Sequence, residues 1–205
     1  MFDLFQFVAD CREAMVSDKS QKYLREVVAR AVSEPAAVIA ALGEPQRAGL
    51  HKLYQSRELT VLNVVWAPMM TVMPHNHQMS AMIGIYTGRE DNIFWRRVPG
   101  IPGKVEAAGA KALSVGDAEP LGHNIIHSVT NPIPRLTGAL HVYCGDFFNP
   151  ARRSEWDPET LTEQPFDPER AVSRFEDANK LFERESRLSG NSGLIPPVGL
   201  PSATT

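Results

Sequence analysis

The chain has 205 residues, of which 43% are hydrophobic, and a formal net charge of −3. This length and composition fit one domain with a sizeable core and flanking segments. The scattered charges form no basic stripe, which argues against a nucleic-acid partner, and no apolar run approaches the ~20 residues needed to cross a membrane. Residues 1–15 lack the pattern of a signal peptide, and Cys11 and Cys144 are too unlike in context to form a disulfide framework. We therefore expect a soluble, cytoplasmic protein.

Apolar residues at helical spacing predict three helices at the start of the chain. They cover residues 2–16, 19–32 and 35–42, and Pro35 suits the first turn of the third helix. We expect this N-terminal helical segment, residues 1–48, to pack on the outside of the domain that follows.

From Leu50 the chain becomes rich in Val, Ile, Thr and aromatic residues, with Gly and Pro between short runs. These runs predict strands at residues 50–57, 59–67, 70–75, 79–87, 91–98, 104–114, 117–121, 125–130 and 135–147. Many short strands separated by turns indicate a sandwich or a barrel, which we place at residues 49–160. Gly88 and the polar residues 89–92 after it are predicted to form a turn.

The end of the chain returns to helical signals. The Trp-Asp-Pro sequence at residues 156–158 is expected to mark the exit from the β region. A helix is predicted at residues 167–187, with Asp167 as its N-cap and Pro168 at its first position. It belongs to a C-terminal segment, residues 161–205, whose last part is rich in Gly, Pro and Ser and reads as a tail.

Two histidines, His75 and His77, lie one residue apart at a predicted strand. Alternate side chains on a strand share a face, so both imidazoles point the same way and could chelate a metal ion. Taken alone, the pair is better explained as two ordinary histidines near the end of a strand, so the rest of the chain decides.

A second motif lies about forty residues further on. Gly116 and Asp117 form a predicted turn, His127 follows Gly116 by eleven residues, and Asn131 follows His127 by four. This spacing resembles the second motif of the cupin superfamily at its Gly-Asp, His and Asn positions.

The first cupin motif is matched by His75, His77 and the closing Gly88. The two motifs together resemble those of cupins, which implies a mainly β fold, the double-stranded β-helix or jelly-roll barrel, with a metal inside. Around this barrel the chain adds N-terminal helices and one C-terminal helix.

The chain departs from the usual cupin pattern at one metal ligand. The usual cupin has a glutamate four or five residues after the second histidine, where this chain has Ala81 and Met82. The resemblance therefore implies one divalent ion held by His75, His77 and His127 without a carboxylate. Imidazole suits Fe, Ni, Cu and Zn alike, so the ligand type alone does not name the metal.

A third group of residues narrows the resemblance. Ala139, His141 and Tyr143 share one face of a predicted strand, where an imidazole and a phenol could relay protons. An amphipathic strand with hydrogen-bonded polar tips would show the same pattern. Here the chain resembles the cysteine dioxygenase-type thiol dioxygenases, including 3-mercaptopropionate dioxygenases, in which three histidines hold Fe(II) and a Ser-His-Tyr series lines the pocket. Ala139 replaces the serine, and no cysteine at 81 or 82 is available to cross-link Tyr143.

The same resemblance implies an arginine that holds the substrate carboxylate. In the family it lies either before the first motif or nine residues after the tyrosine. Arg57 is near the first place, Arg152 is at the second, and Arg153 is adjacent. We expect Arg152 rather than Arg57 to bind substrate, because a guanidinium can grip a carboxylate with two parallel hydrogen bonds.

These observations favour an Fe(II) thiol dioxygenase that uses O₂ to convert a small thiol carboxylate into its sulfinate. Two alternatives stay open: another metal-dependent cupin oxygenase with a non-thiol substrate such as a diketone or a phenol, and a non-catalytic metal-binding cupin that senses a ligand. The expected partners are a small molecule and O₂, with no nucleic acid and no membrane. The oligomeric state is left open, a homo-oligomer included.

Overall fold

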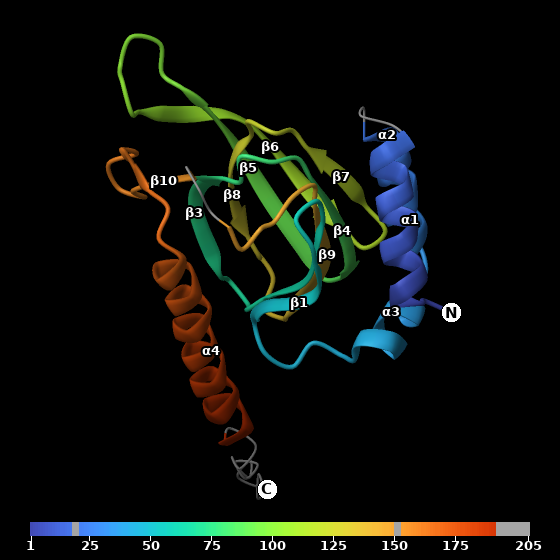
Figure 1. The fold of residues 1–205 in the computed structure, drawn as a ribbon. Coiled ribbons are helices and arrows are strands. Elements are labelled where there is room, and N and C mark those ends of the chain that lie inside the picture. Colours follow the sequence, from blue (N-terminus) through green and yellow to red (C-terminus); the bar gives the residue numbers. More distant parts are fainter. Residues whose placement is uncertain (18–20, 150–152, 192–205) are drawn as a thin grey trace, which may run out of the picture.

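The computed structural model of the chain describes residues 1–17, 21–149 and 153–191. Its helices are α1 (Leu4–Ser17), α2 (Lys22–Val32), α3 (Pro35–Leu42) and α4 (Pro168–Asn191). Its strands are β1 (Gly49–Gln55), β2 (Thr60–Trp66), β3 (Thr71–Asn76), β4 (Ala81–Thr87), β5 (Arg89–Arg97), β6 (Val105–Ser114), β7 (Ala118–Leu121), β8 (Ile126–Thr130), β9 (Thr137–Tyr143), β10 (Ser154–Trp156) and β11 (Glu163–Pro165) (Figure 1). Arg152 and the predicted tail from residue 192 onward lie outside the described residues.

The strands form two antiparallel sheets with the pairing of a jelly roll. One sheet has the order β1-β2-β9-β4-β7 and the other β11-β10-β3-β8-β5-β6. Strands β2 to β5 pair in turn with β9, β8, β7 and β6, as if one long hairpin had been rolled into a barrel. This arrangement is the double-stranded β-helix, so the predicted fold class is confirmed.

The sheet of β2, β9 and β4 is buried on both faces, which explains why these strands read as nearly continuous apolar runs. On β4, Ala81, Ile83 and Ile85 belong to the core inside the barrel, whereas Met82 and Tyr86 belong to a second core outside it. His141 and Tyr143 on β9 share the inward face with Ala139, and their register opposite β4 is fixed by this alternation.

Helices α1 to α3 cover the outer face of this sheet, with α2 against β4 and β7 (Figure 1). Buried residues from all three helices contact the outward residues of β2, β4 and β9; from the helices these are Phe7, Val8, Cys11, Ala14, Leu24, Val28, Val32 and Val38. The described residues of these helices therefore complete the outer core and are absent from the core inside the barrel.

Gly84 on β4 lies where α2 approaches the sheet most tightly. A Cβ atom at this position would lie 2.5 Å from Val28 Cγ1 and 2.9 Å from Val32 Cγ1. We expect Gly84→Ala to lower the free energy of unfolding by about 1–3 kcal/mol, because overpacking must push α2 outward. Gly109→Ala on the exposed strand β6, where no atom lies within 4 Å, is the matched control. Equal urea midpoints for the two variants would contradict the close fit of α2.

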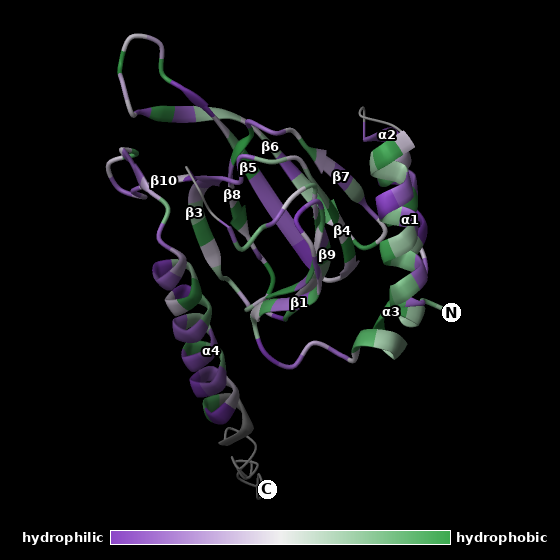
Figure 2. Ribbon diagram, in the orientation of Figure 1, coloured by the Kyte–Doolittle hydropathy of each residue, from purple (hydrophilic) through white to green (hydrophobic). Residues whose placement is uncertain are grey.

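Helix α4 covers the opposite side of the barrel, next to β1 and β3 (Figure 1). Phe175 stacks on Trp66 with ring centroids 5.4 Å apart, and the side chain of Asn179 donates to and accepts from the backbone of Ala48. Figure 2 shows that hydrophilic residues predominate along α4, and ion pairs of Arg47 with Glu176 and Glu183 and of Arg170 with Glu155 add to these contacts. Among the described residues, no helix is both long enough and apolar enough to span a membrane.

Two local predictions are wrong. The polar residues 89–92 do not form a turn, because Gly88 alone makes it at a φ of +81° and β5 begins at Arg89. The β region does not end near Trp156, because β10 pairs with both β3 and β11. Both corrections matter for the site, since β5 and the segment before β10 supply residues to it.

Candidate metal centre

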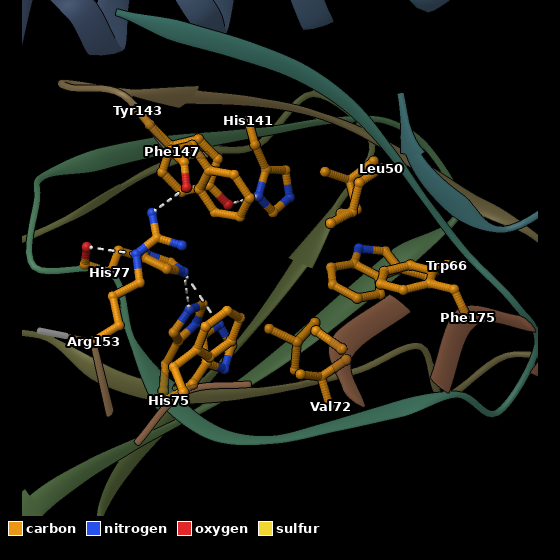
Figure 3. Close-up of a pocket in the computed structure, with 15 residues that line it drawn as sticks. Leu50, Trp66, Val72, His75, His77, His141, Tyr143, Phe147, Arg153 and Phe175 are labelled. Carbon is orange, nitrogen blue, oxygen red and sulfur yellow. Dashed lines mark hydrogen bonds between the residues drawn. The ribbon is translucent and has the colours of Figure 1, made fainter. Parts of the chain in front are cut away.

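Three histidines from two neighbouring strands converge inside the barrel (Figure 3). His75 lies near the end of β3 and is the direct partner of His127 on β8, which places both side chains on one face of the sheet. His77 follows β3, and its Nε2 lies 3.1 Å from Nε2 of His75 and 3.4 Å from Nε2 of His127. We call His75, His77 and His127 the three-histidine cluster.

Hydrogen bonds at the far nitrogens set the protonation of two of these rings. Nδ1 of His75 donates to the carbonyl oxygen of Met73 at 2.9 Å, and Nδ1 of His127 donates to Oδ1 of Asn92 at 2.7 Å. Both rings therefore direct an unprotonated Nε2 toward His77. Burial holds the pKa of His75 at about 4 and the pKa values of His77 and His127 well below their usual range, so the cluster is neutral at pH 7.

This donor set fits a divalent metal ion. Two nitrogens about 2.1 Å from one ion, at the angles of tetrahedral or octahedral coordination, lie about 3.0–3.4 Å apart, and the measured separations are 3.1 and 3.4 Å. Without a cation, a single proton on His77 cannot satisfy two facing lone pairs at once. The cluster could hold one metal ion, and its neutral ligands would leave the 2+ charge of that ion uncompensated.

Apolar residues occupy the two positions where the usual cupin motif has a metal-binding glutamate. Ala81 and Met82 are both fully buried, and Met82 points to the outer core. Ala81 is the direct partner of Tyr143 across β4 and β9, so a methyl group stands opposite the phenol.

The cluster faces a cavity of about 60 Å³. This volume is several times the roughly 10–15 Å³ that a cavity needs to hold one water molecule. Apolar side chains form most of its wall, from Leu50, Val64, Trp66, Val72, Val129, Phe147, Phe166, Ala171 and Phe175. The space suits a small molecule with a few polar atoms, enclosed on one side by α4.

His141 and Tyr143 line the same cavity from β9 (Figure 3). Nδ1 of His141 and the hydroxyl of Tyr143 are 3.1 Å apart, and the Tyr143 ring lies edge-on to the ring of His77, with centroids 5.0 Å apart. Burial raises the pKa of the Tyr143 phenol, so its hydroxyl is protonated at neutral pH. The inward direction of both side chains agrees with the predicted strand periodicity.

Arg153 is a buried cation in the cavity wall, only 5% exposed. Its Nε donates to the carbonyl of His77 at 3.1 Å, its Nη2 donates to the carbonyl of Phe147 at 2.7 Å, and its guanidinium lies 4.3 Å from the centre of the Phe147 ring. Within the described ranges, no carboxylate forms an ion pair with it, and burial lowers its pKa. A buried, unpaired guanidinium beside neutral imidazoles is poised to receive an anion.

Of the two arginines expected from sequence, only Arg57 lies within the described residues. Arg57 is exposed on the turn between β1 and β2 and, among the described residues, does not belong to the cavity wall. Arg152 lies outside the described residues, and its role stays a prediction.

Three residues of the site were not predicted from sequence as site residues: Glu90, Asn92 and Arg153. Glu90 and Asn92 alternate on β5, which directs both side chains inward, where Asn92 contacts His127. The available signal was the period of two along this strand, which puts Glu90 and Asn92 on the same face as Phe94, but the polar run after Gly88 was assigned to a turn. For Arg153, the available signal was that it directly follows Arg152, which lies nine residues after Tyr143, where the resembled dioxygenases carry a substrate-binding arginine.

The second-motif residue Asn131 has a structural role. Its side-chain amide donates to the carbonyl oxygens of Ala67 and Arg135 and lies outside the cavity wall. His123, four residues before His127, is exposed and hydrogen-bonds Asn124.

No protein-family model matches the chain, and no curated protein matches it. Among solved structures, it is similar to an RmlC-like cupin family protein with a double-stranded β-helix fold from Methanocaldococcus jannaschii, at 10% identity over 51% of this chain and 86% of that one, with a TM-score of 0.42. The DMSP lyase DddQ from Ruegeria pomeroyi DSS-3 has 19% identity over 55% of this chain and 53% of its own, with a TM-score of 0.41. An oxalate oxidase in complex with glycolate has 12% identity over 53% and 55%, with a TM-score of 0.39.

The assignment of the fold rests on the strand pairing described above and not on these likenesses. Fold and site together define a double-stranded β-helix barrel whose interior carries a three-histidine cluster able to hold a metal ion.

Proposed function

We propose that this chain is a metal-dependent oxygenase, and specifically a thiol dioxygenase that converts a small thiol carboxylate into its sulfinate. The observation that carries the proposal is a small cavity lined by the neutral three-histidine cluster and, beside His77, by the buried, unpaired Arg153. Such a cavity suits a short molecule with a metal-binding group at one end and a negative charge at the other.

The overall reaction adds both atoms of O₂ to one thiol sulfur. The O–O bond breaks, two S–O bonds form, and the sulfur is oxidised while O₂ is reduced, so no further oxidant or reductant is needed. A divalent ion such as Fe(II), when held by His75, His77 and His127, supplies a Lewis acid that acidifies a thiol and a redox-active centre for O₂.

The residues of the chain would bind, orient and protect the substrate. Arg153 would hold the carboxylate through its guanidinium, whose Nη1 makes none of the hydrogen bonds found in the described residues. Tyr143 and His141 would relay the thiol proton away from the substrate, because the phenol oxygen can accept it as the hydroxyl proton passes to Nδ1 of His141. The apolar wall around Trp66 and Phe175 would exclude water from the reacting groups.

The direct test measures O₂ uptake by Fe(II)-loaded protein with 3-mercaptopropionate, cysteine, cysteamine and 2-mercaptoethanol, and also with a diketone and a phenol. We expect uptake with a carboxylate thiol, and a product heavier by two oxygen atoms. Uptake only with a diketone or a phenol would favour another cupin oxygenase. Tight metal and ligand binding without uptake for any compound would favour a sensor.

Replacing Arg153 tests the carboxylate contact. Arg153→Lys keeps the charge and loses the planar fork, so we expect the KM for 3-mercaptopropionate to rise by roughly 10-fold to 150-fold, equivalent to about 1.5–3 kcal/mol. The KM for 2-mercaptoethanol, which has no carboxylate, should change little. Arg57→Lys on the exposed turn is the matched control, and Arg152→Lys tests the position expected from sequence. Equal effects of Arg153→Lys on both thiols would exclude the proposed contact.

A further inference from the structure

Glu90 is a fully buried carboxylate that the proposed reaction does not use. It lies on β5 behind the cavity wall, and it accepts hydrogen bonds from Nε1 of Trp66 at 2.7 Å and Nδ2 of Asn92 at 2.9 Å, with Nε2 of His141 at 3.4 Å. Among the described residues, neither Lys nor Arg forms an ion pair with it, and His141 is its sole charged-pair candidate. A buried carboxylate without a cation is costly unless its hydrogen bonds are well placed.

These hydrogen bonds keep the carboxylate ionised. Burial alone would raise the pKa of Glu90, but the hydrogen bonds from His141, Asn92 and Trp66 outweigh it and hold this pKa below its usual value. The group is therefore an acceptor at every contact, since an ionised carboxylate has no proton to donate.

Hydrogen bonds through Asn92 connect Glu90 to the three-histidine cluster. Asn92 donates its Nδ2 to Glu90, so its Oδ1 is the atom that faces Nδ1 of His127. The orientation of the amide thus follows from Glu90, and it leaves the proton of His127 on Nδ1, away from the cluster.

A second chain of contacts connects Glu90 to His141 and, through it, to Tyr143. Because an ionised Glu90 can only accept, a hydrogen bond between Glu90 and His141 requires a proton on Nε2 of His141. In the ring that carries this single proton, Nδ1 of His141 is an acceptor, and the Tyr143 hydroxyl 3.1 Å away donates to it. The phenol oxygen consequently presents lone pairs, and not its proton, to the cavity.

We propose that Glu90 is a positioning residue that fixes His141 in the Nε2-protonated tautomer and so directs the Tyr143 hydroxyl proton toward His141. In the resembled Ser-His-Tyr series a serine hydroxyl is present, and this chain has Ala139 in its place. Here Glu90 is the polar group that contacts His141 on the side away from Tyr143. The proton on Nε2 follows from the contact between Glu90 and His141 together with the ionised state of Glu90, and only its consequence for turnover rests on the proposed function.

The tautomer can be read directly by long-range ¹H–¹⁵N NMR of the imidazole rings in Zn(II)-loaded protein at neutral pH. In the unmodified chain, we expect His141 to be protonated on Nε2, and protonation on Nδ1 would overturn the proposal. Glu90→Met removes the acceptor with little change in volume, so we expect His141 to lose its preference for Nε2 protonation.

Tyr143→Phe is the matched variant, because it removes the hydroxyl on the other side of His141 and leaves Glu90 in place. We expect His141 to keep the Nε2-protonated form in this variant. Loss of that form in Tyr143→Phe, together with its retention in Glu90→Met, would show that Tyr143 sets the tautomer and that Glu90 does not. Because this experiment does not measure turnover, failure of the inference is distinguishable from failure of the proposed activity. The spectrum of the unmodified chain tests the inference even if Glu90→Met does not fold.

Discussion

Replacement of His127 by alanine is expected to abolish stoichiometric binding of a divalent metal. His127 contributes one of the converging Nε2 atoms. No glutamate can replace it as a ligand at the position usual in cupins, because Ala81 and Met82 lie there. A site with two imidazoles has too few protein ligands for a closed or a catalytic first-row metal centre. Metal content after dialysis, measured by elemental analysis, gives the result directly.

The chain provides a matched control and an intermediate variant. His123→Ala removes an exposed histidine four residues away and should leave the metal content unchanged. Asn92→Ala removes the hydrogen-bond partner of His127 and should weaken metal binding by about 10–100-fold, as is typical for such outer partners. Full metal retention in His127→Ala would show that the three-histidine cluster is not the metal site.

Much of the fold was accessible from the sequence because local patterns and distant motifs agree. The alternation along β9 placed His141 and Tyr143 on one face, and the resemblance of the motifs around His75, His77 and His127 to those of cupins implied strands that meet inside a barrel. Helical spacing also predicted α2, whose Val28 packs against Gly84.

The remaining part of the site depends on pairings that no local pattern encodes. From sequence, Glu90 was assigned to a turn because it lies two residues after Gly88 and among polar neighbours. Its position on β5 instead directs its side chain into the barrel. Its environment is made by Trp66 and His141, which are remote in sequence. Similarly, counting residues from Tyr143 indicated Arg152, whereas the hydrogen bonds of Arg153 to the carbonyls of His77 and Phe147 depend on how the chain returns to β10.

Tyr143→Phe is expected to slow turnover of the metal-loaded protein by about 10²–10⁴-fold, the range typical of a positioned acid–base group. The variant removes the hydroxyl that contacts His141 and leaves the ring between His77 and Phe147 in place. Metal binding should therefore persist, because the cluster and its hydrogen bonds to Met73 and Asn92 are untouched. The measurement is kcat for the preferred thiol, beside metal content.

Tyr86→Phe is the matched control for this change. Tyr86 is also buried and also donates its hydroxyl to a side chain, Asn63, at 2.9 Å, but it belongs to the outer core under the N-terminal helices. Both variants lose a buried hydrogen bond and should lose similar stability, roughly 0.5–1.5 kcal/mol. A selective loss of kcat in Tyr143→Phe therefore reports proton transfer, because stability and metal content are matched. Equal kcat values in the two variants would remove Tyr143 from the catalytic machinery and leave binding by Arg153 and the metal ion as the main contributions of the cavity.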